Sequence, residues 1–432
     1  MKGRNTLAST LRFVIPLLLA VRLDSAESFE PLAPYTAPSI HGVDTSTLTG
    51  KVMAGYQGWF NCEGDGAGLG WTHWADKREQ LLAPGNVKVD LWPDVSECGP
   101  DELFPTGFQL ADGKPAPVFS SYRRETVLRH FRWMREYGID GVFVQRFANG
   151  LKNDAQRHHK NVVLANCREG ANREGRAYVV MYDLSGLPAG GVSQVIDDWR
   201  ILRAKMKIGD DAAYLRHHGK PLVAVWGVGF GDGRKYTLAE CRKLIEFLKA
   251  DGCSVMLGIP TGWQELNRDA SPDPALHDVL NLADVLSPWT PGRYRNPEEV
   301  TFHGEKHWKP DVLWCQAHSL DYMPVVFPGF SWHNMESESP LGQIPRRKGE
   351  FLWSQFVAAK TAGARMIYIA MFDEVDEGTA ISKCTNDVPV SPTHFLNLEG
   401  LPSDHYLWLT GQGAALLRGE IPLKNALPKR HP

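Results

Sequence analysis

Four carboxylic acids follow one apolar segment near the C-terminal end of the sequence. Residues 366–372 (MIYIAMF) are long enough to form one fully buried strand, and Gly378 and Thr379 predict a turn shortly afterwards. In parallel α/β barrels, catalytic acids stand at the C-terminal ends of strands, so this position favours acid/base chemistry. The alternative interpretation is a solvated acidic turn that ends the strand. The four acids between strand and turn are Asp373, Glu374, Asp376 and Glu377.

Aromatic rings, amides and one further acid are expected at the ends of the other predicted strands. Tryptophan and tyrosine rings can stack on the apolar faces of sugars, and amides and carboxylates can bind sugar hydroxyls. Glycoside cleavage needs two carboxyl groups, of which one protonates the leaving oxygen. We therefore predict a carbohydrate site that includes Asp373 and Asp376. The other candidate substrate-binding residues are Tyr56, Gln57, Trp59, Gln145, Asp183, Trp226, Trp332, His333 and Asn334.

Apolar runs and helical spacing alternate along the chain. Strands are predicted at 51–56, 140–146, 176–182, 221–226, 254–259, 285–288, 323–328 and 365–372. Helices are predicted at 122–137, 158–173, 192–206, 238–249, 276–282, 305–320, 349–362 and 404–417. Eight such units predict an α/β fold, a single-domain (β/α)8 TIM barrel with long active-face loops. An open doubly wound sheet is the alternative, but the G-x-G-x-x-G turn typical of it does not follow the first strand.

The N-terminal residues predict export. Residues 1–26 combine basic residues, an apolar run at 13–21 and small residues at 24–26, as a signal peptide does. We expect a secreted or periplasmic protein with an irregular lead-in at 27–50. The catalytic barrel is then predicted at 51–420 and a C-terminal tail at 421–432.

Composition excludes several other functions for the 432-residue chain. A net charge of −3 gives no strong field for nucleic acid. The apolar run at 13–21 is too short to span a membrane, and no other stretch is long enough. G-x-S-x-G, H-E-x-x-H and Walker motifs are missing from the sequence, so we expect neither a metal nor a cofactor. The oligomeric state is not predicted.

Cysteine and histidine pairs complete the sequence-based predictions. There are 7 cysteines, an odd number, and we predict that Cys62 and Cys98 pair across a glycine-rich loop. The adjacent pairs 158–159 and 217–218 are histidines that we expect on the solvated surface.

The acidic segment and its surroundings resemble a known enzyme family. Residues 372–381 (FDEVDEGTAI) are similar to the F-N-E-W-H-E-G-T-Q-I motif of glycoside hydrolase family 99, which comprises endo-α-mannosidases and endo-α-mannanases on a TIM barrel. Residues 328–330 (PGF) and 346–351 also resemble family segments. The likeness covers about the last quarter of the chain, and related family 71, of α-1,3-glucanases, shares the architecture. The closest description is therefore family 71/99-like.

The resemblance implies roles for two glutamates. Glu374 would act on the 2-hydroxyl of the sugar, and Glu377 would be the acid/base. Together they would give retention through a 1,2-anhydro sugar without a glycosyl-enzyme. A general acid must hold its proton near neutral pH, so we expect a raised pKa at Glu377.

The segment also departs from the family pattern. Asp373, Val375 and Asp376 stand where the family has Asn, Trp and His. The changed residues alter stacking, hydrogen bonding and charge, so a mannoside-like substrate is favoured but not assumed. The alternatives are an α-glucanase, a xylosidase or arabinosidase, a carbohydrate-binding barrel without catalysis, and calcium binding by the acids, for which the EF-hand pattern is not met.

Overall fold

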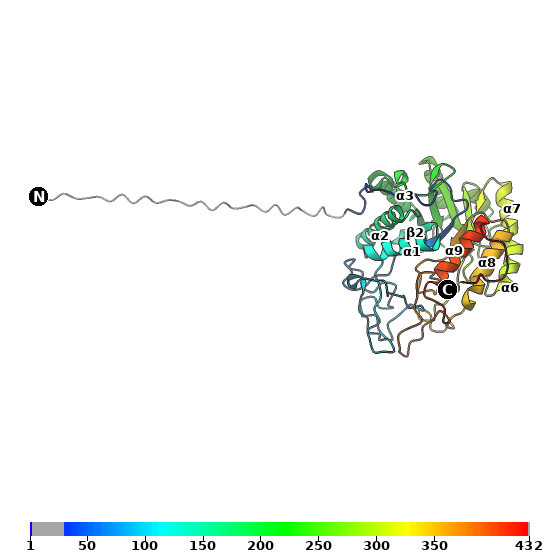
Figure 1. Cartoon of the computed structure of the whole chain (residues 1–432). Coiled ribbons are helices and arrows are strands. Elements are labelled where there is room, and N and C mark those ends of the chain that lie inside the picture. Colours follow the sequence, from blue (N-terminus) through cyan, green and yellow to red (C-terminus); the bar gives the residue numbers. More distant parts are fainter. Residues whose placement is uncertain (2–29, 431–432) are drawn as a thin grey trace. The chain divides into compact units, whose positions relative to one another are not determined.

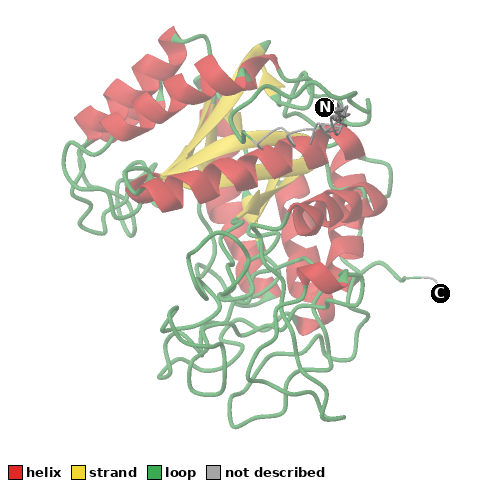
Figure 2. Cartoon of the chain, turned by 90° about the vertical axis from the view of Figure 1, so that its left-hand side faces the viewer, coloured by secondary structure: helices red, strands yellow, loops and turns green. Residues whose placement is uncertain are grey.

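A curled parallel β-sheet forms the centre of the protein (Figures 1 and 2). The computed structural model describes Met1 and residues 30–430, so the predicted signal peptide at 1–26 lies outside the described residues. Most strands are buried throughout, as expected for apolar runs in a sheet that is covered on both faces. The parallel strands are β1 (Val52–Tyr56), β2 (Gly141–Phe147), β3 (Ala177–Asp183), β5 (Lys220–Trp226), β6 (Ser254–Ile259), β7 (Val285–Pro288), β8 (Asp321–Tyr322), β9 (Val325–Val326) and β10 (Ile367–Ile369).

The sheet closes into a barrel through an interrupted strand. Its order is β8-β7-β6-β5-β3-β2-β1-β10-β9, and a short strand β4 (Arg216–His217) pairs antiparallel with β5. Only Met323 and Pro324 separate β8 from β9. The Met323 N–H donates to the Leu286 carbonyl (2.9 Å), and the Pro324 carbonyl accepts from Tyr368 (3.0 Å). These two pieces therefore form one strand, which joins both ends of the sheet.

Helices connect successive strands and cover the barrel (Figure 2). The α-helices of the described chain are α1 (Arg124–Tyr137), α2 (Asp154–Glu174), α3 (Ser193–Ile201), α4 (Leu238–Ala250), α5 (Ala275–Leu280), α6 (Pro297–His303), α7 (Lys309–Ala317), α8 (Glu350–Thr361) and α9 (His405–Arg418). The prediction of an α/β TIM barrel is confirmed. One helix differs, because the predicted 305–320 segment begins inside a π-helical turn at Gly304–Trp308 and continues as α7, while this turn joins α7 to the preceding α6.

Long loops leave the C-terminal ends of β1, β9 and β10 and gather at one end of the barrel (Figure 2). The loop after β1 lies against the segment after β10, since Leu91 bridges to Leu396 and Pro93 to Cys384. Residues 31–430 belong to one compact unit. In the described part of the chain, no helix is both long enough and apolar enough to cross a membrane.

Two predictions outside the barrel are wrong. All seven cysteines are free thiols. The Cys62 sulfur lies 3.3 Å from the Phe119 carbonyl oxygen and the Cys98 sulfur lies 3.5 Å from the Arg129 guanidinium, so the predicted pair has separate partners. The histidine pairs are not wholly solvated either: the exposed fraction is 5% for His159 and 1% for His217.

Candidate functional site

The acidic segment is a compact turn at the end of β10. The Phe372 N–H donates to the Gly55 carbonyl (2.7 Å), which continues the pairing with β1. The Glu374 carbonyl then accepts the N–H groups of Thr379 (3.1 Å) and Ala380 (2.9 Å). Gly378 has a φ of +62°, and a Cβ there would lie 3.0 Å from the Ser331 nitrogen. Glycine therefore permits the turn that holds the acids at the barrel rim.

Asp373 fixes this turn to the end of β1. Its two carboxylate oxygens accept the backbone N–H groups of Gln57 and Gly58, each at 2.8 Å. Burial raises the pKa of Asp373 to about 7, although both N–H groups lower it. The side chain is fully buried. Asp373 therefore positions the site and does not face a substrate, contrary to its prediction as a binding residue.

Glu374 is held by one donor at each oxygen. Gln57 Nε2 lies 2.6 Å from Oε1, and Thr379 Oγ1 lies 2.6 Å from Oε2. Burial raises the pKa of Glu374 well above its usual value, and the carboxyls of Glu377 and Asp376 raise it further, while the two donors lower it. The donors fix the orientation of the carboxyl group and favour its ionised form.

Glu377 contrasts with Glu374, because its carboxyl group has no hydrogen bond to any described residue. The side chain is only partly buried, and its backbone carbonyl accepts from the Ser331 N–H (2.9 Å). Burial raises the pKa of Glu377 to about 7, and the nearby Asp376 adds to the effect. Two coupled carboxyls do not ionise together readily. The pKa values of both carboxyls are raised, so the pair shares a proton near neutral pH, and the two donors at Glu374 favour a charge on that residue.

Asp376 connects the acids to an aromatic pair in the loop after β1. Its Oδ2 lies 2.9 Å from His73 Nδ1, while its Oδ1 is buried without a partner. The His73 ring stacks on Trp59 at 3.7 Å between centroids and 3° between planes. Trp59 is also 5.2 Å from the Phe147 ring. A partly exposed aromatic surface therefore lies beside the carboxyls, and substrate binding by Trp59 and Asp376 stays a prediction.

Arg346 is a positioning residue that the sequence interpretation gave no role. Its guanidinium group is buried and donates to the carbonyls of Gly378 (2.8 Å) and Ala380 (2.7 Å). The cation lies 4.4 Å from the centre of the Tyr406 ring. Arg346 thereby holds the chain just beyond Glu377. The only signal in the sequence was its place in a segment that resembles the family.

The three candidate residues after β9 form hydrogen bonds that hold their own loop in place. They are Trp332, His333 and Asn334. The backbone N–H groups of His333 (2.7 Å) and Asn334 (2.9 Å) donate to the buried Asp90 carboxyl, which also binds the Ser331 hydroxyl. Asn334 Nδ2 donates to two backbone carbonyls. The Trp332 indole donates to the Ser339 hydroxyl (2.9 Å), and His333 Nδ1 pairs with the Ser339 carbonyl (2.7 Å). Their polar groups are largely engaged in holding this loop.

Gln145 and Asp183 occupy the rim as predicted. Gln145 Nε2 donates to the Tyr368 hydroxyl inside the barrel (2.8 Å), and Gln145 Oε1 is buried without a partner. The Asp183 carboxyl accepts the Ser185 N–H (2.6 Å), and burial raises its pKa. Gln145 thus retains a free acceptor beside the acids, whereas Asp183 caps a turn.

Tyr56 and Trp226 lie in different surroundings. Tyr56 is fully buried, and its hydroxyl pairs with His130 of α1 (2.9 Å), so the prediction that it binds substrate is wrong. Its side chain fills the space between strand and helix. Trp226 is partly exposed, with the Arg234 guanidinium 4.9 Å from its ring centre and Trp289 5.6 Å away. These neighbours pack against the ring, and Trp226 is partly exposed at the end of β5.

A cavity of about 290 Å³ adjoins the acids on the β2 side, and Gln57 connects the two. It is lined by Trp59 and His73, by residues at the end of β2, and by Lys160 of α2. A larger cavity of about 720 Å³ lies between α6, α8 and residues 425–427, and no residue of the acidic segment lines it. No residue of the acidic segment lines the smaller cavity either, but two of its lining residues bind the acids: Gln57 binds Glu374 and His73 binds Asp376. These two contacts associate the smaller cavity with the candidate chemistry.

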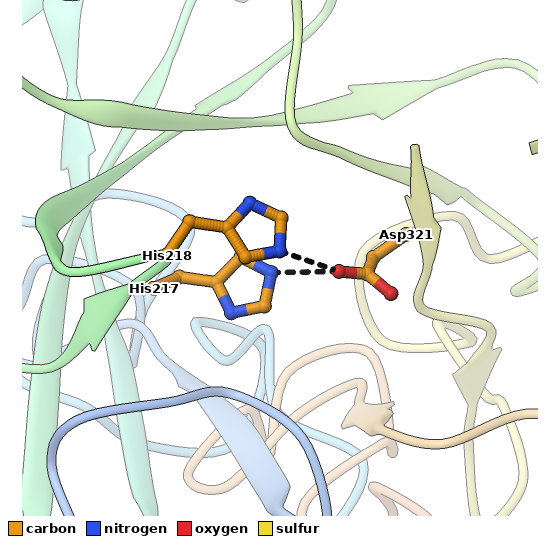
Figure 3. Close-up of side chains that lie close together, drawn as sticks. All are labelled: His217, His218 and Asp321. Carbon is orange, nitrogen blue, oxygen red and sulfur yellow. Dashed lines mark hydrogen bonds and ion pairs between the residues drawn. The ribbon is translucent and has the colours of Figure 1, made fainter. Parts of the chain in front are cut away.

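A second cluster of titratable groups lies at the opposite, N-terminal end of the strands (Figure 3). Nε2 atoms of His217 (2.9 Å) and His218 (3.1 Å) both approach Asp321 Oδ2, and these residue types can bind metal ions. However, the Leu48 N–H donates to His217 Nδ1 (3.3 Å). The proton of neutral His217 is therefore on Nε2, where it donates to Asp321, and the cluster does not offer three free ligands.

Comparison with known proteins confirms the fold. No protein-family model and no curated protein matches the sequence. The solved structure of the GH99 endo-alpha-mannosidase from Bacteroides thetaiotaomicron superposes with a TM-score of 0.62 at 18% identity and covers 86% of this chain and 99% of its own. Its complex with BIS-TRIS-propane gives 0.62 and 18%, with 87% and 99% covered.

A further structure, a glycoside hydrolase-like protein, has a TM-score of 0.52 at 13% identity and covers 89% of this chain and 99% of its own. The similarity extends over most of the chain, well beyond the C-terminal quarter in which the sequence resemblance is found. The fold is thus that of the GH99 structures.

Proposed function

We propose that the protein is a secreted or periplasmic glycoside hydrolase that cleaves α-linked poly- or oligosaccharides. The observation that carries the proposal is the difference between two neighbouring carboxyls at the barrel rim. Glu374 has a donor at each oxygen, and Glu377 has none and a pKa of about 7. One base held in place and one acid that keeps its proton near neutral pH are what glycoside cleavage needs.

The first step forms a bond within the sugar. The Glu374 carboxylate removes the proton from the 2-hydroxyl, and the resulting oxygen attacks C1. The bond from C1 to the leaving oxygen breaks, and Glu377 protonates that oxygen. Gln57 and Thr379, which bind the Glu374 oxygens at 2.6 Å, keep the base oriented during this step.

The second step opens the 1,2-anhydro sugar with water. Glu377, now ionised, takes a proton from water. The oxygen of this water attacks C1, and the C1–O2 bond breaks. Glu374 returns its proton to O2. Two inversions at C1 give net retention, and both glutamates regain their initial protonation states.

A mannoside-like substrate is favoured by the similarity to the GH99 structures. The segment lacks the Trp and His of the family motif, although Trp59 and His73 supply an aromatic surface from another loop. An α-glucanase or a xylosidase or arabinosidase are the alternatives on the same site. The free Glu377 carboxyl argues against a carbohydrate-binding barrel without catalysis.

A substrate screen tests the proposal. Purified protein is incubated with α-mannan, α-glucan, xylan and arabinan oligosaccharides, and products are separated by anion-exchange chromatography. The matched control is Glu377→Gln, prepared in parallel to exclude a contaminating enzyme. Proton NMR during the first minutes reports the anomer released. Release of the inverted anomer would contradict the two-step route, and cleavage of no glycan would contradict the proposed function.

A further inference from the structure

The cavity beside the acids contains several polar atoms that the protein itself does not satisfy. Buried polar groups in folded proteins are nearly always hydrogen-bonded, so a group of exceptions needs an explanation. Gln57 connects these atoms to the acids, because its Nε2 binds Glu374 and its Oε1 is free. The buried atoms without partners around the cavity are Gln57 Oε1, Trp59 Nε1, Asn61 Oδ1, Gln145 Oε1 and His159 Nε2.

Lys160 brings a positive charge to the same cavity. Its side chain is partly buried and makes no hydrogen bond or ion pair with any described residue. The Asp198 carboxyl, whose charge raises the pKa of Lys160, is already bound by Arg146 through two contacts of 2.6 Å and by the Tyr182 hydroxyl at 2.7 Å. Asp198 therefore balances Arg146, and the charge of Lys160 has no partner of its own.

The burial of an unpaired ammonium group has a cost. Burial and, to a smaller extent, the charge of Arg146 lower the pKa of Lys160 to about 8. The ammonium form nevertheless predominates at neutral pH. Transfer of such a charge out of water is unfavourable unless an anion compensates it. A bound anion would remove that cost, because it would supply the missing opposite charge.

The cavity lining has no carboxyl group that could supply the opposite charge for Lys160. Besides Lys160 it includes Arg78, His73 and His159, but neither aspartate nor glutamate. Burial lowers the pKa of His159 to about 3, with a further contribution from the charge of Lys160, so that His159 is neutral and can donate or accept one hydrogen bond. Arg78 pairs with Glu79 and His73 with Asp376, so the unbalanced charge at this cavity is the positive charge of Lys160.

We propose that this cavity binds a sugar unit that carries an anionic substituent, a carboxylate or a sulfate ester, with Lys160 as its counter-charge. The inference rests on the proposed function and names the substrate class of that site. The free amide oxygens of Gln57 and Gln145 accept sugar hydroxyls, and Trp59 supplies an indole N–H donor. The adjacent glutamates then act on the glycosidic bond of a polyanionic glycan.

The test compares neutral and anionic glycans. All three arms are α-mannan oligosaccharides, because their 2-hydroxyl stands trans to the leaving oxygen, as attack of O2 on C1 requires. A form oxidised to the carboxylate at C6 provides the carboxylate arm, a form sulfated at the same position the sulfate arm, and the unmodified form the neutral arm. Lys160→Met is compared with Lys152→Met, which alters an exposed lysine just before α2. We expect Lys160→Met to raise KM for one anionic arm roughly 10–100-fold, as for the loss of a charged hydrogen bond. Neutral glycans and Lys152→Met should give little change, and Lys160→Arg should restore most binding.

Two results would overturn the inference. One is that Lys160→Met raises KM equally for neutral and anionic glycans. The other is that the parent protein cleaves only neutral glycans. Calorimetric binding of the same oligosaccharides to Glu377→Gln separates this inference from the proposed function. If nothing is cleaved but an anionic oligosaccharide binds through Lys160, the function fails and the inference stands. If neutral glycans are cleaved and no anionic one binds, the inference fails alone.

Discussion

Two clusters of titratable side chains lie at opposite ends of the same barrel, and they differ in how completely they are satisfied. At the N-terminal end, His217 uses both ring nitrogens: one accepts from Leu48 and the other donates to Asp321. At the C-terminal end, Glu377 has no hydrogen bond to a described residue, and Asp376 Oδ1 is buried without one. Similar residue types thus form a closed network at one end and an open one at the other.

The difference indicates where the molecule stabilises its fold and where it is prepared to react. A closed network contributes stability because its buried groups are paired. An open network leaves polar groups unsatisfied, which costs stability unless a ligand completes it. Barrel enzymes place catalysis at the C-terminal face and stability at the other, and the two clusters follow this division.

The largest effect is expected for Glu374→Gln. The amide cannot remove the 2-hydroxyl proton, and one of its positions would place an N–H₂ group against the Gln57 donor. Activity should fall roughly 10²–10⁴-fold on natural glycosides and on aryl glycosides alike, because the 2-hydroxyl is needed whatever group leaves. Steady-state kinetics on both substrate types measures this. Parent-like rates on either type would remove Glu374 from the mechanism.

Glu377→Gln should separate the two substrate types. Natural glycosides need a proton on the leaving oxygen, so their hydrolysis should also fall roughly 10²–10⁴-fold. Aryl glycosides with acidic leaving groups need little protonation and should lose less in the first step. Glu336→Gln, an exposed glutamate in the loop after β9, is the control. Equal losses on both substrate types would show that Glu377 is not the general acid.

His217→Ala should break the closed network instead. The substitution leaves the buried Leu48 N–H without a partner, leaves Asp321 with only the exposed His218, and opens a cavity, so the free energy of unfolding should fall by about 2–3 kcal/mol. The rate constant of the folded enzyme should stay within about twofold. Urea denaturation and kinetics together test both expectations. His218→Ala, whose side chain is 52% exposed, should cost less than about 1 kcal/mol.

A loss of activity without a loss of stability in His217→Ala would contradict the division between the two ends. Zinc titration gives a second check. Because His217 Nδ1 accepts the Leu48 N–H, stoichiometric zinc should not raise the unfolding midpoint. A zinc-dependent rise in the parent that is lost in His217→Ala would show that the cluster binds metal after all.

Much of the fold could be predicted from the sequence, because each barrel strand is a continuous apolar run with a helical pattern behind it. The interrupted strand was less clear, since Met323 and Pro324 divide it into two short pieces that pair with different neighbours. The acid turn was also visible, because four carboxyls directly after an apolar run are uncommon in a buried segment.

The partners of the site residues could not be predicted in the same way. His73 and Asp376 are 303 positions apart and meet only because β1 and β10 pair where the barrel closes. Lys160 lies on a helix whose periodicity indicates which side faces the barrel but not that a cavity lies there. The Asp90 contacts that engage His333 and Asn334 likewise arise from loop packing, which leaves no periodic pattern.

The smallest effect concerns how stability depends on pH. A carboxyl whose pKa is about 7 in the folded protein and near 4.5 when unfolded binds a proton more tightly in the folded state. Its contribution is therefore fully present below the unfolded pKa and is lost as the pH rises through about 7. Glu377→Gln removes this pH-dependent contribution, so the fall in unfolding free energy from pH 5 to pH 8 should be about 1–2 kcal/mol smaller than in the parent.

The exposed Glu336→Gln control should show the same dependence of unfolding free energy on pH as the parent. Urea denaturation at several pH values measures the difference, and identical slopes in all three proteins would mean that Glu377 is solvated like an ordinary surface acid. In that case the open end of the barrel would carry no stored electrostatic cost, and the contrast between its two ends would rest on hydrogen bonding alone.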